Sequence, residues 1–313
     1  MGRGGKGIGR RAALRSADSA SQLNIMIEGL AMKTGMNMLL WSTHITPEHY
    51  PLIAKLKQTG FDGVEIPLFE GDANHYKALA KEIRNNGLGC TTVTCVGPDA
   101  NPISPDAKVR QAAVDRHKWA IEMTAILGGE YLCGPYHSPL AVFSGTGPTE
   151  DERKRAADVL RQSAETAQQH KVGLAIEYLN RFECYFLTTA AQAKELVQRV
   201  NHPNFHCMYD TFHANIEEKN AAGTIKFLAG TFVHVHISES DRGIPGTGMV
   251  HWDETFRALK QVGYDGWLVI EAFGRALPDL AAATKVWRDL FASTEAVYTE
   301  GLRFMKQQWV TAR

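Results

Sequence analysis

Eight short apolar segments recur between Met36 and the C-terminus, and each is followed by a stretch with the spacing of an amphipathic helix. Short apolar runs bounded by turn residues are typical of strands that are buried on both faces. Eight such strand–helix units in fewer than 300 residues predict a parallel, right-handed (β/α)₈ TIM barrel of the α/β class. The expected strands are 38–42, 60–66, 89–96, 130–134, 172–178, 205–210, 231–238 and 266–273.

A doubly wound open sheet is the alternative fold for alternating strands and helices. Such sheets usually carry a Gly-rich turn after the first strand, whereas the corresponding segment here reads WSTHITPEH (41–49) and contains no GxGxxG. We therefore predict one barrel domain over residues 36–313 with a C-terminal helix. The expected helices include 74–86, 149–171, 189–200, 215–229, 252–262 and a terminal run at 278–310.

The first 35 residues differ from the rest in composition. The segment MGRGGKGIGRRAALRSADSASQ (1–22) is rich in Gly, Arg and Ser and offers little apolar surface to bury, so we expect it to be disordered. An Arg-rich, Ser-containing leader is also typical of targeting segments. We favour a non-native or over-extended start upstream of Met36 and exclude residues 1–35 from the predicted domain.

Charge and cysteine content exclude several classes of protein. Lys plus Arg and Asp plus Glu number 34 each, so no basic excess favours nucleic acid or an anionic membrane surface. No apolar run approaches the roughly 18 residues of a membrane span. The five cysteines are odd in number and form no CxxC pair, which indicates buried, reduced thiols in a cytoplasmic enzyme.

Four potential metal ligands occur at the ends of consecutive predicted strands. Active sites of (β/α)₈ barrels are built at the C-terminal ends of the strands, so side chains at these positions converge. Three carboxylates and one imidazole would be costly to bury together without a cation. An oxygen-rich set with one nitrogen suits Mn²⁺, Mg²⁺ or Co²⁺ better than a closed zinc site. The four residues are Glu177, Asp210, His236 and Glu271.

Three more polar residues follow these ligands in the same loops. Glu183, His213 and Arg242 lie three to six residues after a ligand, and each has local hydrogen bonding in its loop as an alternative role. The Gly-rich segment RGIPGTG (242–248) lacks the Lys and Ser/Thr of a phosphate-binding P-loop, so we interpret it as a tight loop.

The segments around these residues resemble the ketose 3-epimerases, the group of D-tagatose, D-psicose and L-ribulose 3-epimerases. The resemblance extends from about Met36 to the C-terminus and depends on IEYLNRFE (176–183), YDTFHANIEE (209–218), HVHISESDRGIPGTG (234–248) and VIEAF (269–273).

The resemblance implies a role for each of the seven polar residues. Glu177, Asp210, His236 and Glu271 match the metal ligands, and Glu177 and Glu271 also match the catalytic acid/base pair. Glu183, His213 and Arg242 match positions that hold the carbonyl end of the sugar. We expect Mn²⁺ ahead of Co²⁺ or Mg²⁺, no organic cofactor, and a homodimer or homotetramer.

The residues suit the chemistry that this resemblance implies. Inverting carbon 3 of a ketose requires removal of a weakly acidic proton next to a carbonyl and its return on the opposite face. A divalent metal stabilises the resulting enediolate. Strands five and eight are well separated around the barrel rim, so Glu177 and Glu271 are expected to flank a sugar lying between them.

Three alternative functions use a similar barrel. An aldose–ketose isomerase related to hydroxypyruvate isomerase would use the same metal site. A DNA-cutting barrel of the endonuclease IV type would need more ligands and a basic face, and a sugar-binding barrel would not need both glutamates. The sequence does not rank L-ribulose, D-tagatose, D-psicose and D-fructose. We expect specificity to reside in Trp41, His44, Cys90 and segments 67–72 and 133–143.

Overall fold

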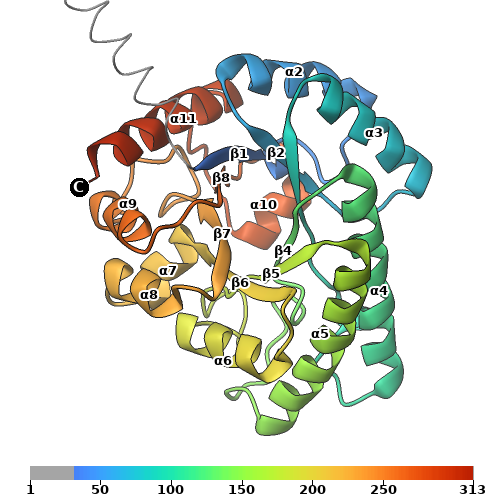
Figure 1. The fold of residues 1–313 in the computed structure, drawn as a ribbon. Helices are drawn as coiled ribbons and strands as arrows, with labels where there is room; N and C mark the ends of the chain where they lie inside the picture. The colour runs from blue at the N-terminus through green and yellow to red at the C-terminus, as the bar shows by residue number, and fades with distance from the viewer. Residues whose placement is uncertain (1–31, 313) are drawn as a thin grey trace, which may run out of the picture.

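The computed structural model describes residues 32–312, which form a closed barrel of eight parallel strands inside a ring of helices (Figure 1). The strands follow one another around the barrel in chain order, and β8 pairs with β1 to close it. The predicted fold is confirmed. The strands are β1 (Lys33–Asn37), β2 (Gly63–Pro67), β3 (Gly89–Val93), β4 (Tyr131–Gly134), β5 (Gly173–Ile176), β6 (Phe205–Asp210), β7 (Phe232–Ile237) and β8 (Trp267–Ile270).

The predicted position of the first strand is wrong. The first strand is β1, and Met38–Leu40 forms a 3₁₀ turn, η1, rather than the strand expected at 38–42. Lys33 lies at the N-terminal end of the barrel and pairs with Glu130 at 2.8 Å, and Gly35 packs against Val269. Neither residue is apolar, so a search for apolar runs does not identify this segment as a strand. The prediction for residues 1–31 lies outside the described residues.

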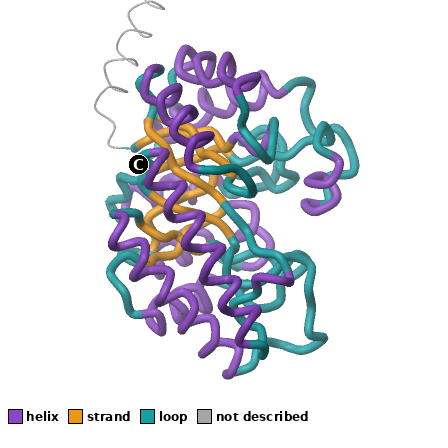
Figure 2. Tube along the Cα trace, turned by 90° about the vertical axis from the view of Figure 1, so that its right-hand side faces the viewer, coloured by secondary structure: helices purple, strands orange, loops and turns teal. Residues whose placement is uncertain are grey.

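Helices surround the strands, and the longer loops gather at one end of the barrel (Figure 2). Asp72, Asp106 and Thr149 begin three of the helices, and each side chain accepts a hydrogen bond from a backbone N–H of the first turn. The helices are α2 (Tyr50–Thr59), α3 (Ala73–Asn85), α4 (Ala107–Leu127), α5 (Glu150–His170), α6 (Ala190–Val200), α7 (Thr211–Glu217), α8 (Ala221–Leu228), α9 (Trp252–Gln261), α10 (Pro278–Thr284) and α11 (Thr294–Thr311), with 3₁₀ turns η2 (Pro47–His49) and η3 (Pro98–Ala100).

Two of the predicted helices are each divided in two. The segment predicted at 215–229 consists of α7 and α8, because the Asn220 side chain begins a new helix by accepting from Gly223 N. The terminal run predicted at 278–310 consists of α10 and α11. Lys285 ends α10 in a left-handed conformation (φ 61°), and Ser293 begins α11 with a side-chain cap. The interruption lets α10 lie across the end of the barrel (Figure 1).

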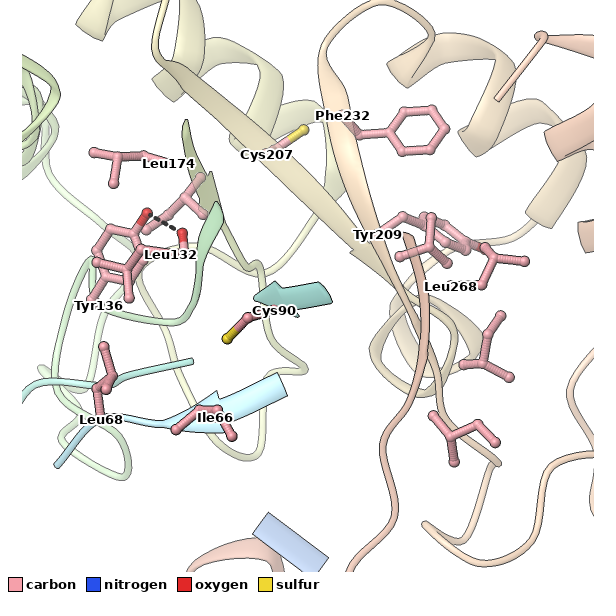
Figure 3. Packing of buried hydrophobic residues seen from close by; sticks show 14 of the residues in the cluster. Ile66, Leu68, Cys90, Leu132, Tyr136, Leu174, Cys207, Tyr209, Phe232 and Leu268 are labelled. Atoms are coloured by element: carbon pink, nitrogen blue, oxygen red, sulfur yellow. Dashed lines mark hydrogen bonds between the residues drawn. The ribbon is translucent and has the colours of Figure 1, made fainter. Parts of the chain in front are cut away.

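Side chains alternate between the two faces of each strand. Outward ones such as Ile66, Leu132 and Leu268 form the main apolar cluster (Figure 3). Inward ones fill the barrel, where Trp267 closes the N-terminal end over Gly63. The same inward positions lead to the C-terminal end, where the polar residues lie.

All five cysteines lie within the described residues, and none forms a disulfide. Between residues 32 and 312, no helix combines the length and the apolar character that crossing a bilayer requires.

Candidate active site

Four predicted ligands meet at the C-terminal end of the barrel. Glu177 and Glu271 directly follow β5 and β8, Asp210 ends β6, and His236 lies near the end of β7. One ligand atom from each lies within 4.8 Å of the others. His236 Nδ1 is 3.3 Å from Glu271 Oε1, 3.6 Å from Asp210 Oδ2 and 3.8 Å from Glu177 Oε1. The spacing of one βα unit therefore does bring these side chains together.

Three atoms of this cluster are buried without a hydrogen-bond partner among the described residues. They are Glu177 Oε1, Asp210 Oδ2 and His236 Nδ1. Buried acceptors without partners are rare and costly in folded proteins. A divalent cation would satisfy all three at once, and three carboxylates with one imidazole suit a hard divalent ion. The residues present therefore fit a divalent metal.

The surroundings shift the pKa values of Glu177 and Glu271 in opposite directions. Burial and repulsion from Glu271 raise the pKa of Glu177 well above its usual range. Burial acts in the same direction on Glu271, but His236 and Arg242 outweigh it and lower the pKa of that carboxyl. Glu177 therefore holds a proton more readily than Glu271.

Arg242 and His213 lie at the same cluster, and both line the pocket. Arg242 is 3% exposed, contacts the Glu271 carboxylate through Nη1, and lies 3.5 Å from Asp210 Oδ2. His213 Nδ1 accepts from the backbone N–H of Asn180 at 2.9 Å, and its Nε2 lies 3.0 Å from Arg242 Nη2 and 3.6 Å from Glu177 Oε1. Burial lowers the pKa of His213 to about 3, which keeps this ring neutral.

The loop that carries Arg242 is held in an unusual conformation. Arg242 has a φ of 68°, in the left-handed region that costs a non-glycine residue about 1–2 kcal/mol. Its backbone N–H donates to Glu239 O at 2.9 Å, and its carbonyl accepts from Phe273 N at 3.0 Å. The guanidinium also stacks on the Phe212 ring at 3.8 Å. Such strain is typical of functional positions.

Glu183 completes the set of predicted site residues. Its carboxylate accepts from Asn180 Nδ2 at 2.9 Å, and burial raises its pKa above the ordinary value. Glu183, His213 and Arg242 line one pocket together with Glu177 and Glu271. The structure thus places all seven predicted residues at one site.

The pocket has a polar end and an apolar wall, which is the usual character of a small-molecule site. The prediction of the wall is partly wrong. Phe69, Pro135 and Leu140 come from the expected segments, but Trp41, His44 and Cys90 do not line the pocket. Trp41 packs on Tyr298, His44 stacks on His75, and Cys90 lies in the apolar cluster. Residues that the sequence reasoning missed include Leu39, Val93, Phe273, Leu280, Ala283 and Thr284.

Two further polar residues escaped the sequence analysis. Glu65 is fully buried in β2 and bonds His236 Nε2 at 2.8 Å. Asn37, at the end of β1, donates to both Glu65 and Glu271. The sequence signal for Glu65 is an acid in the middle of the apolar run VEI (64–66).

Comparisons with known proteins agree with the geometry. The chain matches the xylose isomerase-like TIM barrel family over residues 53–308. It is 32% identical to L-ribulose 3-epimerase from Mesorhizobium japonicum over 289 residues, which cover 90% of this chain and 95% of the relative. It is also 32% identical to D-psicose 3-epimerase from Ruminiclostridium cellulolyticum over 268 residues, 83% of this chain and 90% of the relative. A solved structure of L-ribulose 3-epimerase superposes with a TM-score of 0.86 at 30% identity, covering 90% and 96% of the two chains.

Proposed function

The chain belongs to the xylose isomerase-like TIM barrel family and, within it, to the ketose 3-epimerases, and from this premise we propose that it epimerises free ketoses at carbon 3. The proposed substrates are L-ribulose and D-psicose, for which relatives are named, together with D-tagatose and D-fructose, with which structures of D-psicose 3-epimerase have been solved. The observation that carries the proposal is the pocket in which two buried glutamates, from β5 and β8, lie beside His236 and Asp210.

Glu177, Asp210, His236 and Glu271 would hold the divalent metal. The bound ion would supply positive charge that makes the proton at carbon 3 more acidic and stabilises the enediolate. The three atoms without hydrogen-bond partners support this assignment, because they belong to three of these four residues. We propose Mn²⁺ as the native ion, since the oxygen-rich set favours it over zinc.

Glu177 and Glu271 exchange the proton in the proposed mechanism. One carboxylate removes the proton from carbon 3, and the other supplies a proton to the opposite face. The two residues follow β5 and β8, so they approach a sugar from different parts of the barrel rim. Reversal of the roles of the two glutamates accounts for the reverse reaction.

Arg242, His213 and Glu183 hold the carbonyl end of the sugar in this proposal. The Arg242 guanidinium is a donor suited to sugar oxygens, the His213 ring lies beside it with Nε2 3.0 Å from Arg242 Nη2, and Glu183 is an acceptor suited to a hydroxyl. The apolar wall on the other side excludes water from the reacting carbon, which strengthens these electrostatic interactions.

The experiment that tests the proposal is a panel of free ketoses in D₂O with Mn²⁺-loaded protein. We expect C3 epimers, resolved by chromatography, with deuterium incorporated at carbon 3. An aldose–ketose isomerase would instead produce aldoses, and this alternative is not favoured because the relatives are named as 3-epimerases. Aldose products would contradict the proposal.

The assembly and the location are separate proposals. We propose a cytoplasmic homodimer or homotetramer. The five free cysteines support a reducing compartment. The apolar residues of α11, including Val297, Leu302 and Met305, are buried against their own barrel. They therefore do not support an oligomer, and the proposal of a dimer or tetramer rests on the resemblance alone. Light scattering tests the assembly, and a mass of 34.6 kDa would contradict it.

A further inference from the structure

A buried carboxylate that the proposed reaction does not use lies directly beneath the metal ligands. Glu65 is 0% exposed and points into the barrel from β2. Its oxygens accept from Asn37 Nδ2 at 3.0 Å, Thr91 Oγ1 at 2.9 Å and His236 Nε2 at 2.8 Å. A carboxylate buried this deeply is stable only when donors surround it. Side chains from β1, β3 and β7 therefore meet at this one group.

The contact with His236 determines which ring nitrogen carries the proton. A carboxylate accepts hydrogen bonds, so the 2.8 Å contact places the proton of a neutral His236 ring on Nε2. Nδ1 then retains its lone pair and faces Glu271, Asp210 and Glu177. Ligating histidines commonly donate their other N–H to a carboxylate in this way, which fixes the ring and raises its basicity.

The contact with Asn37 extends to a second ligand. Asn37 Nδ2 donates to Glu65 Oε1 at 3.0 Å and to Glu271 Oε1 at 3.2 Å. Asn37 Oδ1 accepts from Leu39 N at 2.9 Å, which fixes the orientation of the amide. Glu65 and Glu271 are thus held by two donors of one rigid side chain.

His234 lies on the other side of Glu65 and forms no hydrogen bond to the four ligands among the described residues. Its Nε2 is 2.9 Å from Glu65 Oε2 but is not aligned for a hydrogen bond. His236 is aligned, so the connection to the ligands runs through His236 and Asn37.

We propose that Glu65 is a positioning residue for the metal site, which orients His236 directly and Glu271 through Asn37. This inference rests on the proposed function only in assuming a divalent metal at the four ligands. It assigns to Glu65 no contact with the sugar and no proton transfer. Its role is to set the geometry of two of the four ligands before the ion binds.

The direct test is metal affinity of the Glu65→Gln variant, measured without sugar. Calorimetric titration of metal-free protein with Mn²⁺ should show binding about 10–100-fold weaker than in the wild type. Glutamine keeps the volume but loses the charge, and its amide nitrogen cannot accept from the donors around it. An unchanged affinity would overturn the proposal.

Glu239→Gln is the matched control. Glu239 is also a fully buried glutamate, and it accepts from Trp252 Nε1 at 2.9 Å and from Gly246 N at 2.8 Å without contacting the four ligands. Its Mn²⁺ affinity should stay within about twofold of the wild type. Equal weakening in both variants would show a general loss of structure and contradict the positioning role.

A second measurement needs no variant and therefore does not depend on folding of the mutant. Nitrogen NMR of histidine-labelled wild-type protein loaded with diamagnetic Mg²⁺ reports the tautomer of His236. We expect the proton on Nε2, and a proton on Nδ1 would overturn the proposal. A protein that binds no divalent ion would remove its basis, whereas Glu65-dependent binding without ketose turnover would contradict the proposed function alone.

Discussion

Glu177 and Glu271 have the same side chain but different surroundings. Glu271 accepts from Asn37 Nδ2 and contacts Arg242 Nη1, so both of its oxygens have partners. Glu177 Oε1 has none among the described residues, and the pKa of this carboxyl is raised well above its usual range by burial and by Glu271. The two proposed acid/base groups can therefore be examined separately.

Glu271→Gln should retain metal binding and lose epimerisation. The amide oxygen can still ligate a cation, but the amide cannot accept the proton from carbon 3. We expect kcat to fall about 10²–10⁴-fold, the usual contribution of a positioned acid or base. Calorimetric Mn²⁺ titration of the same sample separates a lost base from a lost metal. A variant that keeps more than about a tenth of the wild-type rate would mean that another group removes the proton.

At the scale of elements, the inward positions of the strands constrain side-chain size. Gly63 lies on β2 with Trp267 of β8 across the barrel floor, and a Cβ at Gly63 would lie 2.6 Å from Trp267 Cζ3 and 2.8 Å from Gly89 O. Real Cβ contacts are longer than this, so the indole ring of Trp267 fits here only when glycine occupies positions 63 and 89. Trp267 can close the barrel only because its neighbours lack side chains.

Gly63→Ala should therefore destabilise the protein. We expect a loss of about 1–3 kcal/mol in the free energy of unfolding, the usual cost of overpacking a core. Chemical denaturation measures it, and Gly147→Ala is the control, because a Cβ at Gly147 would meet nothing within 4 Å. Equal stability of the two variants would mean that the barrel floor is not tightly packed.

The elements differ in how well the sequence predicted them. The bounds of the strand Phe205–Asp210 were predicted correctly, because the strand is a short, mainly apolar run that ends at a carboxylate. β1 was misplaced, because Lys33 and Gly35 are recognisable as strand residues only through their partners Glu130 and Val269. The break between α10 and α11 was missed for a similar reason, since Lys285 gives no glycine or proline signal.

The sequence identified the site residues at the ends of strands, but it did not identify those that lie deeper in the barrel. Glu177 and Glu271 were found through the spacing of βα units. Glu65 was not, because its role depends on contacts with His236 and Asn37 across the barrel. The apolar wall contributed by α10 was also hidden, since no local pattern indicates that Leu280 lies over the pocket.

At the scale of the whole molecule, the charge of the pocket limits its substrates. The chain has no net charge at pH 7 when histidines are neutral, and Arg242 is the one arginine or lysine among the described residues that line the pocket. Its guanidinium already contacts Glu271 and lies near Asp210. Little positive charge therefore remains within this pocket for a phosphate group, although Lys285 and Arg288 line the cavity beside it.

The protein should accordingly prefer free ketoses to sugar phosphates. Comparison of kcat/KM for free D-ribulose and D-ribulose 5-phosphate under the same conditions tests this expectation, with free D-psicose and D-tagatose as references. The segment 242–248 lacks the residues of a phosphate-binding loop, and the extra phosphate would also meet the apolar wall. Faster turnover of the phosphorylated sugar would contradict the account.

The central claim is that one divalent ion, held by Glu177, Asp210, His236 and Glu271, makes this barrel a ketose 3-epimerase. Its most direct test is the rate of C3 epimerisation in protein stripped by a chelator and then titrated with Mn²⁺ or Co²⁺. Because one buried atom each of Glu177, Asp210 and His236 has no hydrogen-bond partner among the described residues, we expect no turnover in the stripped protein and recovery as the ion is added. Full activity in protein shown to be metal-free would contradict it.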